Sequence, residues 1–180
     1  MLAAPGAVLS FWRAAGPKRW FAVDSAFDAE IRERFHATHE AAAAGRLSAW
    51  EGTAEGALAL LIALDQFPRN MFRGTARAFS TDALARAATR RAIERGFDRA
   101  FPMPERNFFY LPFEHSEKLA DQERGVALTE ATGDAEAVKW AKVHLDVIRR
   151  FGRFPHRNAA LGRVSTAEEI AFLEGGGFRA

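Results

Sequence analysis

The sequence predicts an all-α protein of about seven to eight helices packed as antiparallel pairs. Ala occurs 37 times, whereas the strand-favouring residues Val and Ile occur only seven and five times. No segment alternates polar and apolar residues over the length of a strand. Apolar residues instead recur at helical spacing, and glycine or proline punctuates the intervals between them. Because no linker is long enough to divide the chain, we expect a single domain over residues 1–180.

Three helices are expected in the first part of the chain, over residues 5–15, 24–44 and 54–66. The first has a proline at its start and ends before Gly16. The second carries apolar residues at i, i+4 and i+8, which form one buried stripe. The third is apolar on nearly every side and is therefore expected to be buried, with Pro68 ending it.

Four more helices are expected over residues 80–95, 116–132, 134–151 and from residue 165 or 166 onward. The last start carries two overlapping capping boxes, Ser165 with Glu168 and Thr166 with Glu169. Residues 105–112 are rich in aromatic side chains, and the sequence pattern does not assign them a secondary structure. The three consecutive glycines after Glu174 predict a fraying tail.

Composition excludes several classes of function. The net charge is only +2 although the pI is about 9.4, so the chain lacks the basic surface that tracks nucleic-acid phosphates. The absence of cysteine excludes disulfides, thiolate catalysis and cysteine metal sites. No phosphate-binding glycine loop or serine-nucleophile elbow occurs, and no cofactor is predicted. The first twelve residues lack a basic leader and are too short to span a bilayer, so we expect a cytoplasmic protein without a membrane segment.

The segment LDQFPRNMFRGT, residues 64–75, is the first candidate site. Helical geometry places Asp65 among the leucines of the buried helix, where a carboxylate has to be paired or protonated. It is a candidate partner for an arginine or for His144, which it could orient as a general base. Further along the same segment, the candidate ligand-binding residues are Gln66, Arg69, Asn70 and Arg73.

The helix over residues 134–151 and the turn after it form the second candidate site. His144 falls near the middle of the apolar face of this helix. It is either a core histidine bonded to a carbonyl or carboxylate, or a base or donor that lines a pocket. The turn is rich in donors, which either cap helix ends and neutralise carboxylates or form an anion-binding rim. These candidate ligand-binding residues are Arg153, His156, Arg157, Asn158 and Arg163.

The segment YLPFEHSE, residues 110–117, is the third candidate site. His115 is a candidate acid or base, whereas Tyr110 and Glu117 are candidate ligand-binding residues. Ser116 is placed to cap the next helix, and Glu117 to interact with its dipole. These residues do not follow the His-x-x-x-His or Glu-x-x-His spacing of helical metal ligands, so no metal site is predicted.

Two functions follow from these candidates if the three segments converge, as we expect. The first is a binding module for a small anionic molecule or an acidic peptide, held by arginine, histidine and asparagine donors. The second is an enzyme acting on a small phosphate- or carboxylate-bearing substrate. In that enzyme His144 or His115 would transfer protons, Asp65 would orient the histidine, and arginines would hold the anion. The small net charge disfavours a third possibility, RNA binding.

The chain also resembles a known family in its longest motifs. LDQFPRNMFRGT (64–75), RNFFYLPFEHSE (106–117) and RFGRFPHRNAALGRVSTAEEIAFL (150–173) closely resemble the bacterial domain-of-unknown-function 924 family. VLSFW (8–12), RWF (19–21) and FDAEIRERF (27–35) fit the same pattern, although Ser10 stands where an acidic residue is expected. The resemblance implies an all-helical, tetratricopeptide-like fold of packed helix pairs, and it implies no established reaction.

Overall fold

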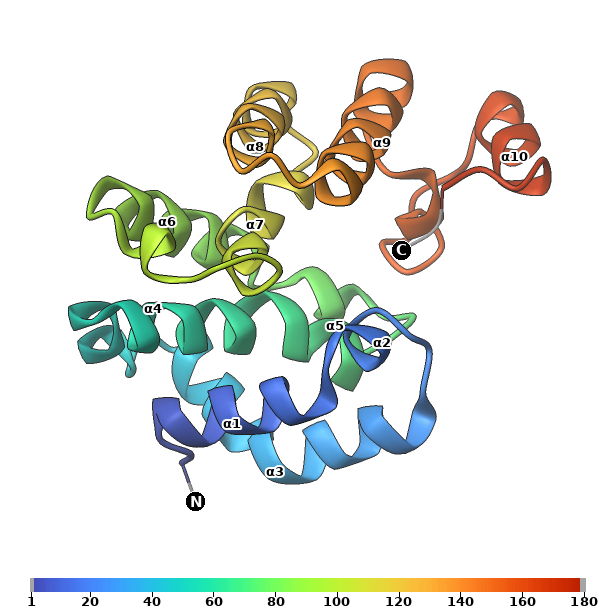
Figure 1. Ribbon diagram of the computed structural model, residues 1–180. Helices are drawn as coiled ribbons and strands as arrows, with labels where there is room; N and C mark the ends of the chain where they lie inside the picture. The colour runs from blue at the N-terminus through green and yellow to red at the C-terminus, as the bar shows by residue number, and fades with distance from the viewer. Residues whose placement is uncertain (1, 179–180) are drawn as a thin grey trace. The chain divides into compact units, whose positions relative to one another are not determined.

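The computed structural model describes residues 2–178, and within them it contains ten α-helical segments and no strand (Figure 1). Seven segments have eight or more residues and correspond to the seven expected helices, which confirms the all-α fold class. They are α1 (Pro5–Ala15), α3 (Ser25–Ala43), α4 (Ala54–Leu61), α6 (Asp82–Glu94), α8 (Leu119–Glu130), α9 (Ala135–Phe151) and α10 (Ala167–Glu174). The other three are too short to show helical periodicity in the sequence: α2 (Pro17–Trp20), α5 (Phe67–Met71) and α7 (Leu111–Glu114).

The chain consists of two compact units. The first runs up to Arg73 and continues from Arg77 to Pro112, whereas the second contains Gly74–Ala76 and the chain from Phe113 onward. The expectation of one domain over residues 1–180 stays a prediction. Over residues 2–178, no helix combines the length and the apolar character needed to cross a bilayer.

Aromatic side chains form the core of the first unit. Phe11 from α1, Phe27 and Phe35 from α3, and Phe67 from α5 are buried. Phe35 and Phe67 stack with their ring centroids 4.8 Å apart. Trp12 meets Phe67 edge to face at 5.8 Å. Aromatic pairs of this kind contribute ~0.5–1.5 kcal/mol each beyond the area that they bury, so this cluster joins α1, α3 and α5.

The helix that contains Asp65 does not end at Pro68, contrary to the sequence prediction. It passes from α4 through a π-helical turn, Ile62–Gln66, directly into α5. In the π turn the N–H of Phe67 donates to the carbonyl of Ile62, five residues back, which frees the carbonyl of Ala63. Pro68 has no N–H to offer the carbonyl of Leu64.

Two buried side chains from neighbouring helices donate hydrogen bonds to these carbonyls. Nδ1 of His39, on α3, donates to Ala63 O at 2.9 Å. The hydroxyl of Thr81, at the start of α6, donates to Leu64 O at 2.6 Å. Because both freed acceptors are paired, the helix tolerates an internal proline, and the turn that contains Asp65 is fixed on two sides.

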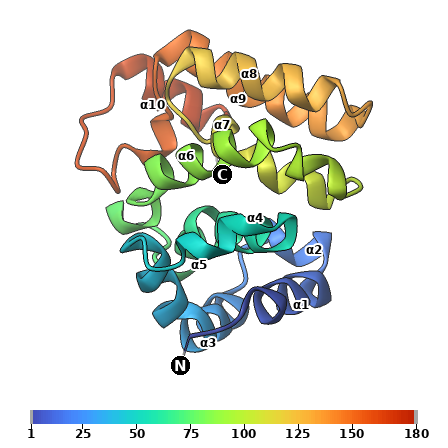
Figure 2. The same ribbon diagram turned by 90° about the vertical axis from the view of Figure 1, so that its left-hand side faces the viewer.

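In the second unit α8 and α9 lie side by side (Figures 1 and 2). The short loop between them makes them antiparallel neighbours, and they pack through Val126, Ala141 and Leu145. Gly152, at φ 68°, ends α9, and its N–H donates to the carbonyl of Ile148. A second cluster of Val147, Ile148 and Phe154 lies at the end of α9, and Phe151, Phe172 and Phe178 pack against it.

Two helix starts in this unit can be compared with their predictions. The helix expected from residue 116 begins at Leu119, and the Ser116 hydroxyl donates to the carboxylate of Asp121 at 2.8 Å and accepts from the N–H of Lys118 at 3.2 Å. Helix α10 begins after Thr166 with the predicted capping box to Glu169, which confirms that signal.

Candidate functional site

Asp65 lies in the first unit and is almost completely buried, in a network with Gln66 and Arg69. Nε2 of Gln66 donates to Asp65 Oδ2 at 2.6 Å, and Arg69 Nη1 lies 3.2 Å from Asp65 Oδ1. Arg69 also forms two hydrogen bonds, at 2.9 and 3.1 Å, with the carboxylate of Asp82. Burial alone would lower the pKa of the Arg69 guanidinium. The carboxylates of Asp65 and Asp82 outweigh that effect, and the pKa of Arg69 is raised. Asp65 is therefore paired, as its predicted burial requires.

The other donors of the first motif bind a carboxylate on α3. Nδ2 of Asn70 donates to Asp28 Oδ1 at 2.7 Å. Arg73 forms a bidentate pair with the same carboxylate, with Nε and Nη2 at 2.9 and 3.0 Å from its oxygens. The motif thus holds α5 against α3, and its donors face acids of the same unit.

Tyr110 is fully buried, and its hydroxyl belongs to a triad that the sequence did not reveal. It donates to Asp98 Oδ2 at 2.7 Å and accepts from Nε of Arg106 at 2.6 Å. Burial raises the pKa of Tyr110 to about 12, and the hydrogen bond to Asp98 adds to the rise. The phenol therefore stays protonated and takes part in the core of the first unit.

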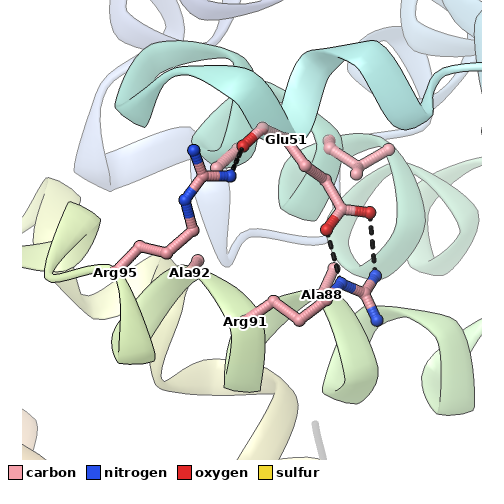
Figure 3. A pocket seen from close by; sticks show the side chains of 7 residues that line it. Glu51, Ala88, Arg91, Ala92 and Arg95 are labelled. Atoms are coloured by element: carbon pink, nitrogen blue, oxygen red, sulfur yellow. Dashed lines mark hydrogen bonds and ion pairs between the residues drawn. The ribbon is translucent and has the colours of Figure 1, made fainter.

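An enclosed cavity of the first unit is too small for a ligand. It measures about 10 Å³ and lies between η1 (Ser48–Gly52), α4 and α6 (Figure 3). Arg91 and Arg95 close it by binding the carboxylate and the backbone carbonyl of Glu51. This space is about that of one water molecule, so it offers no ligand site.

In the second unit, Arg153 and Asn158 meet the helix-capping residue Glu169. Arg153 binds its carboxylate through Nε and Nη2 at 2.6 and 2.8 Å, and Asn158 Nδ2 donates to it at 3.2 Å. These donors, Arg153 first, lower the pKa of Glu169 to about 2. Two of the predicted ligand-binding residues therefore fasten the turn to the start of α10.

Arg163 and Glu117 form a second ion pair on the same turn. Arg163 contacts the two oxygens of Glu117 at 2.7 and 3.0 Å, and the N–H of Phe154 donates to the same carboxylate at 2.8 Å. Burial opposes the charge of Glu117, but Arg163 and this N–H keep its pKa below its usual value. This ion pair joins the loop before α8 to the turn after α9.

Three histidines gather around two phenylalanines in the second unit. The rings of His115 and His144 have centroids 6.1 Å apart. Phe154 lies 5.8 Å from His144 and 5.6 Å from His156. Phe178 lies 4.4 Å from His144 and 5.5 Å from His156. We call these five residues the histidine cluster. Its members come from the end of α7, from α9, from the turn after α9 and from the C-terminal segment.

The protonation of His144 can be assigned from its neighbours. Its Nδ1 lies 2.8 Å from the carbonyl of Trp140, which can only accept, so Nδ1 carries the hydrogen and Nε2 offers a lone pair. Burial first, and then the charges of His115, Arg157 and His156, together lower the pKa of His144 to about 3, although the hydrogen bond to Trp140 O opposes the shift. The carboxylate of Glu114 approaches Nδ1 to 3.9 Å. His144 is neutral at physiological pH.

Arg157 supplies a buried cation beside the cluster. Its side chain is almost completely buried, and the guanidinium lies 4.4 Å above the Phe154 ring. Its Nη1 donates to the carbonyl of His115 at 3.0 Å. The cluster therefore combines ring faces, imidazole nitrogens and one guanidinium within a single unit.

Residues 175–178 pack back onto α10 and the cluster, whereas the sequence predicted a fraying tail at the three glycines. The N–H of Gly177 donates to the carbonyl of Phe172 at 2.9 Å, and Phe178 then packs over His144. Next to it, an open depression of about 470 Å³ is lined by Trp140, Val143, Gly176, Gly177 and Phe178. Sequence reasoning missed Phe178 because a single apolar residue after three glycines shows no periodicity.

The structure brings His115, His144, His156 and Arg157 together and places Gln66, Arg69, Asn70, Arg73 and Tyr110 in the other unit. Asp65 and His144 belong to different units, so their convergence stays a prediction. Among residues 2–178, no group of three or more His, Asp or Glu side chains is arranged to hold a metal ion.

Comparison with known proteins places the chain in a family. A solved structure, that of ATU0120 from Agrobacterium tumefaciens, described as a protein of unknown function, is similar with a TM-score of 0.92. The two sequences are 46% identical, over 96% of this chain and 97% of the other. Among curated proteins, none matches the chain. Residues 8–177 match the family described as bacterial protein of unknown function (DUF924), and the chain therefore belongs to that family.

Proposed function

We propose that the second unit binds a small anionic molecule, or the acidic group of a peptide, at the histidine cluster. The observation that carries this proposal is the convergence of His115, His144 and His156 beside the buried guanidinium of Arg157. Clusters of buried titratable groups with shifted pKa values are typical of binding and catalytic sites.

The electrostatics of the cluster support an anion as the ligand. His115, Arg157 and His156 each lower the pKa of His144, so these groups favour an anion over a cation beside that ring, whereas the carboxylate of Glu114 lies 3.9 Å from its Nδ1. A carboxylate or phosphate on the side of the cluster away from Glu114 could accept hydrogen bonds from imidazole and guanidinium groups.

The arginines outside the cluster give less support as ligand-binding groups. Arg69, Arg73, Arg153 and Arg163 each bind a carboxylate of their own unit. An incoming anion would have to displace those carboxylates, which already satisfy the guanidinium forks. We interpret these four pairs as a structural network, and the gathering of three imidazoles is the reason for placing the proposed ligand at the histidine cluster.

Binding is favoured over catalysis by the lowered pKa of His144. A general base works best when its pKa lies near the working pH, and an imidazole of pKa about 3 is a weak base at neutral pH. Neutral His144 has no N–H left for an anion, since its Nδ1 donates to Trp140 O, so the hydrogen bonds to the ligand fall to the other imidazoles and to Arg157. Two further expectations belong to the proposal: that the helix pairs are tetratricopeptide-like, and that the protein acts in the cytoplasm.

A thermal-shift screen tests the proposal. The panel consists of phosphate, acetate, citrate, benzoate and an acidic peptide, with chloride at matched ionic strength as the blank. A ligand at about 100 times its Kd adds ~2.7 kcal/mol, which corresponds to a rise in Tm of about 5–10 °C for a chain of this size.

Two variants show where the anion binds. His156→Ala removes a partly exposed member of the cluster and is expected to abolish the shift. His36→Ala removes a partly exposed histidine of the first unit and is the matched control, which is expected to keep it. A panel that gives no shift beyond that of chloride, or an equal shift in both variants, would contradict the proposal.

A further inference from the structure

Within the histidine cluster, the Phe178 ring packs against the other members. Its ring is surrounded by three others, His144 at 4.4 Å, His156 at 5.5 Å and Phe154 at 6.1 Å. The corresponding interplanar angles are 60°, 77° and 53°, so none of the three is a parallel stack. Tilted and edge-to-face contacts of this kind depend on the quadrupole of an aromatic ring, which a saturated ring lacks.

The attachment of Phe178 allows its ring to leave. Three consecutive glycines precede it, and glycine is the residue with the greatest backbone freedom. Backbone hydrogen bonds hold these glycines to the end of α10, the last of them from Gly177 N to Phe172 O. Phe178 follows this bond and packs through its ring on His144, His156 and Phe154. The open depression beside the ring provides room into which it can move.

We propose that the slot occupied by Phe178 is the binding site of an aromatic carboxylate, and that Phe178 closes the site until that ligand displaces it. The inference rests on the proposed function, which it deepens by naming the ligand class. The aromatic ring of the ligand takes the place of the Phe178 ring against His144 and Phe154, and its carboxylate accepts hydrogen bonds from His115, His156 or Arg157, because the N–H of His144 already donates to Trp140 O.

Two variants open the slot by different means. Phe178→Ala removes the ring itself. Gly177→Ala keeps the ring but changes the path of the segment, because an added Cβ would lie 2.6 Å from the ring atoms of Phe172. Phe97→Ala is the matched control, since Phe97 is a partly exposed phenylalanine of the first unit that contacts Arg95.

The first measurement is the calorimetric affinity for benzoate, cyclohexanecarboxylate and acetate. If the slot is closed in about nine molecules of ten, opening it lowers the apparent Kd for benzoate about tenfold. Phe178→Ala and Gly177→Ala are expected to show this gain for both ring carboxylates and none for acetate, and benzoate is expected to bind more tightly than cyclohexanecarboxylate in each protein. Phe97→Ala is expected to behave as the wild type does.

The second measurement needs no ligand. The rate at which diethyl pyrocarbonate modifies His144 and His156, read by peptide mass spectrometry, is expected to rise about tenfold in both opened variants. Unchanged rates together with unchanged benzoate affinity would overturn the role of Phe178 but leave anion binding intact. Faster modification without binding of any anion would overturn the proposed function and, with it, the aromatic ligand. Equal affinities of the opened variants for benzoate and cyclohexanecarboxylate would overturn the aromatic class.

Discussion

The lowered pKa of His144 makes a prediction about stability in acid. In the folded protein His144 resists protonation because it is buried and faces the charges of His115 and Arg157. In the unfolded chain its pKa is about 6.5. A histidine whose folded pKa is depressed favours the unfolded state as the pH falls below the unfolded value, and the loss continues down to the folded value, about 3.

The size of the loss follows from these two values. A solution pH of about 5 lies about 1.5 pH units below the pKa of His144 in the unfolded chain and well above its pKa in the folded protein. Each unit costs about 1.4 kcal/mol, so His144 alone removes ~2 kcal/mol from the free energy of unfolding between about pH 8 and pH 5. This is a large part of the stability of an ordinary domain.

Replacing His144 by Asn isolates this effect. The amide of Asn can take the place of Nδ1 as the donor to Trp140 O, but it does not titrate. Urea unfolding of both proteins at about pH 8 and pH 5 gives four free energies, and the wild type is expected to lose ~2 kcal/mol more than the variant. The same loss in both proteins would refute the assignment of His144 as a buried neutral histidine.

Three further substitutions test the networks of the structure. Thr81→Val leaves the carbonyl of Leu64 without a donor and is expected to cost ~1–3 kcal/mol in urea unfolding, whereas Thr81→Ser retains most of the stability. Asp65→Ala is expected to cost ~3 kcal/mol or more, because Arg69 loses one of its two buried carboxylates; an unchanged melting curve would contradict this. Glu169→Gln is expected to lower Tm at neutral pH and to have less effect as the pH falls from about 4.5 toward 2, where the wild-type carboxylate loses its charge.

Helical order was the most predictable feature of the chain. The long helices follow from apolar spacing, and Gly152 and the capping box of Thr166 and Glu169 mark ends that the structure confirms. The continuous helix through Pro68 could not be predicted, because it depends on donors from His39 and Thr81, which lie far away in sequence. Local signals identify a proline as a helix end unless distant residues compensate for it.

The candidate site was predictable in its residue types and less so in its pairing. Arginines were expected to bind anions, and in the structure they do bind carboxylates, but those of Asp28, Asp82 and Glu169 in the same chain. Which carboxylate meets which guanidinium is decided by tertiary packing and has no local signal. The gathering of the histidines around Phe178 depends in the same way on the path of the segment after α10.

The five histidines of the chain allow the most direct test of anion binding at the cluster. The imidazole signals of the wild-type protein would be followed by ¹⁵N–¹H NMR during titration with phosphate, acetate and benzoate in turn. We predict that the signals of His115, His144 and His156 shift together with one Kd for at least one anion, while those of His36 and His39 stay in place. Absence of any shift at the three, or equal shifts at all five, would contradict the proposal that the histidine cluster binds a small anion.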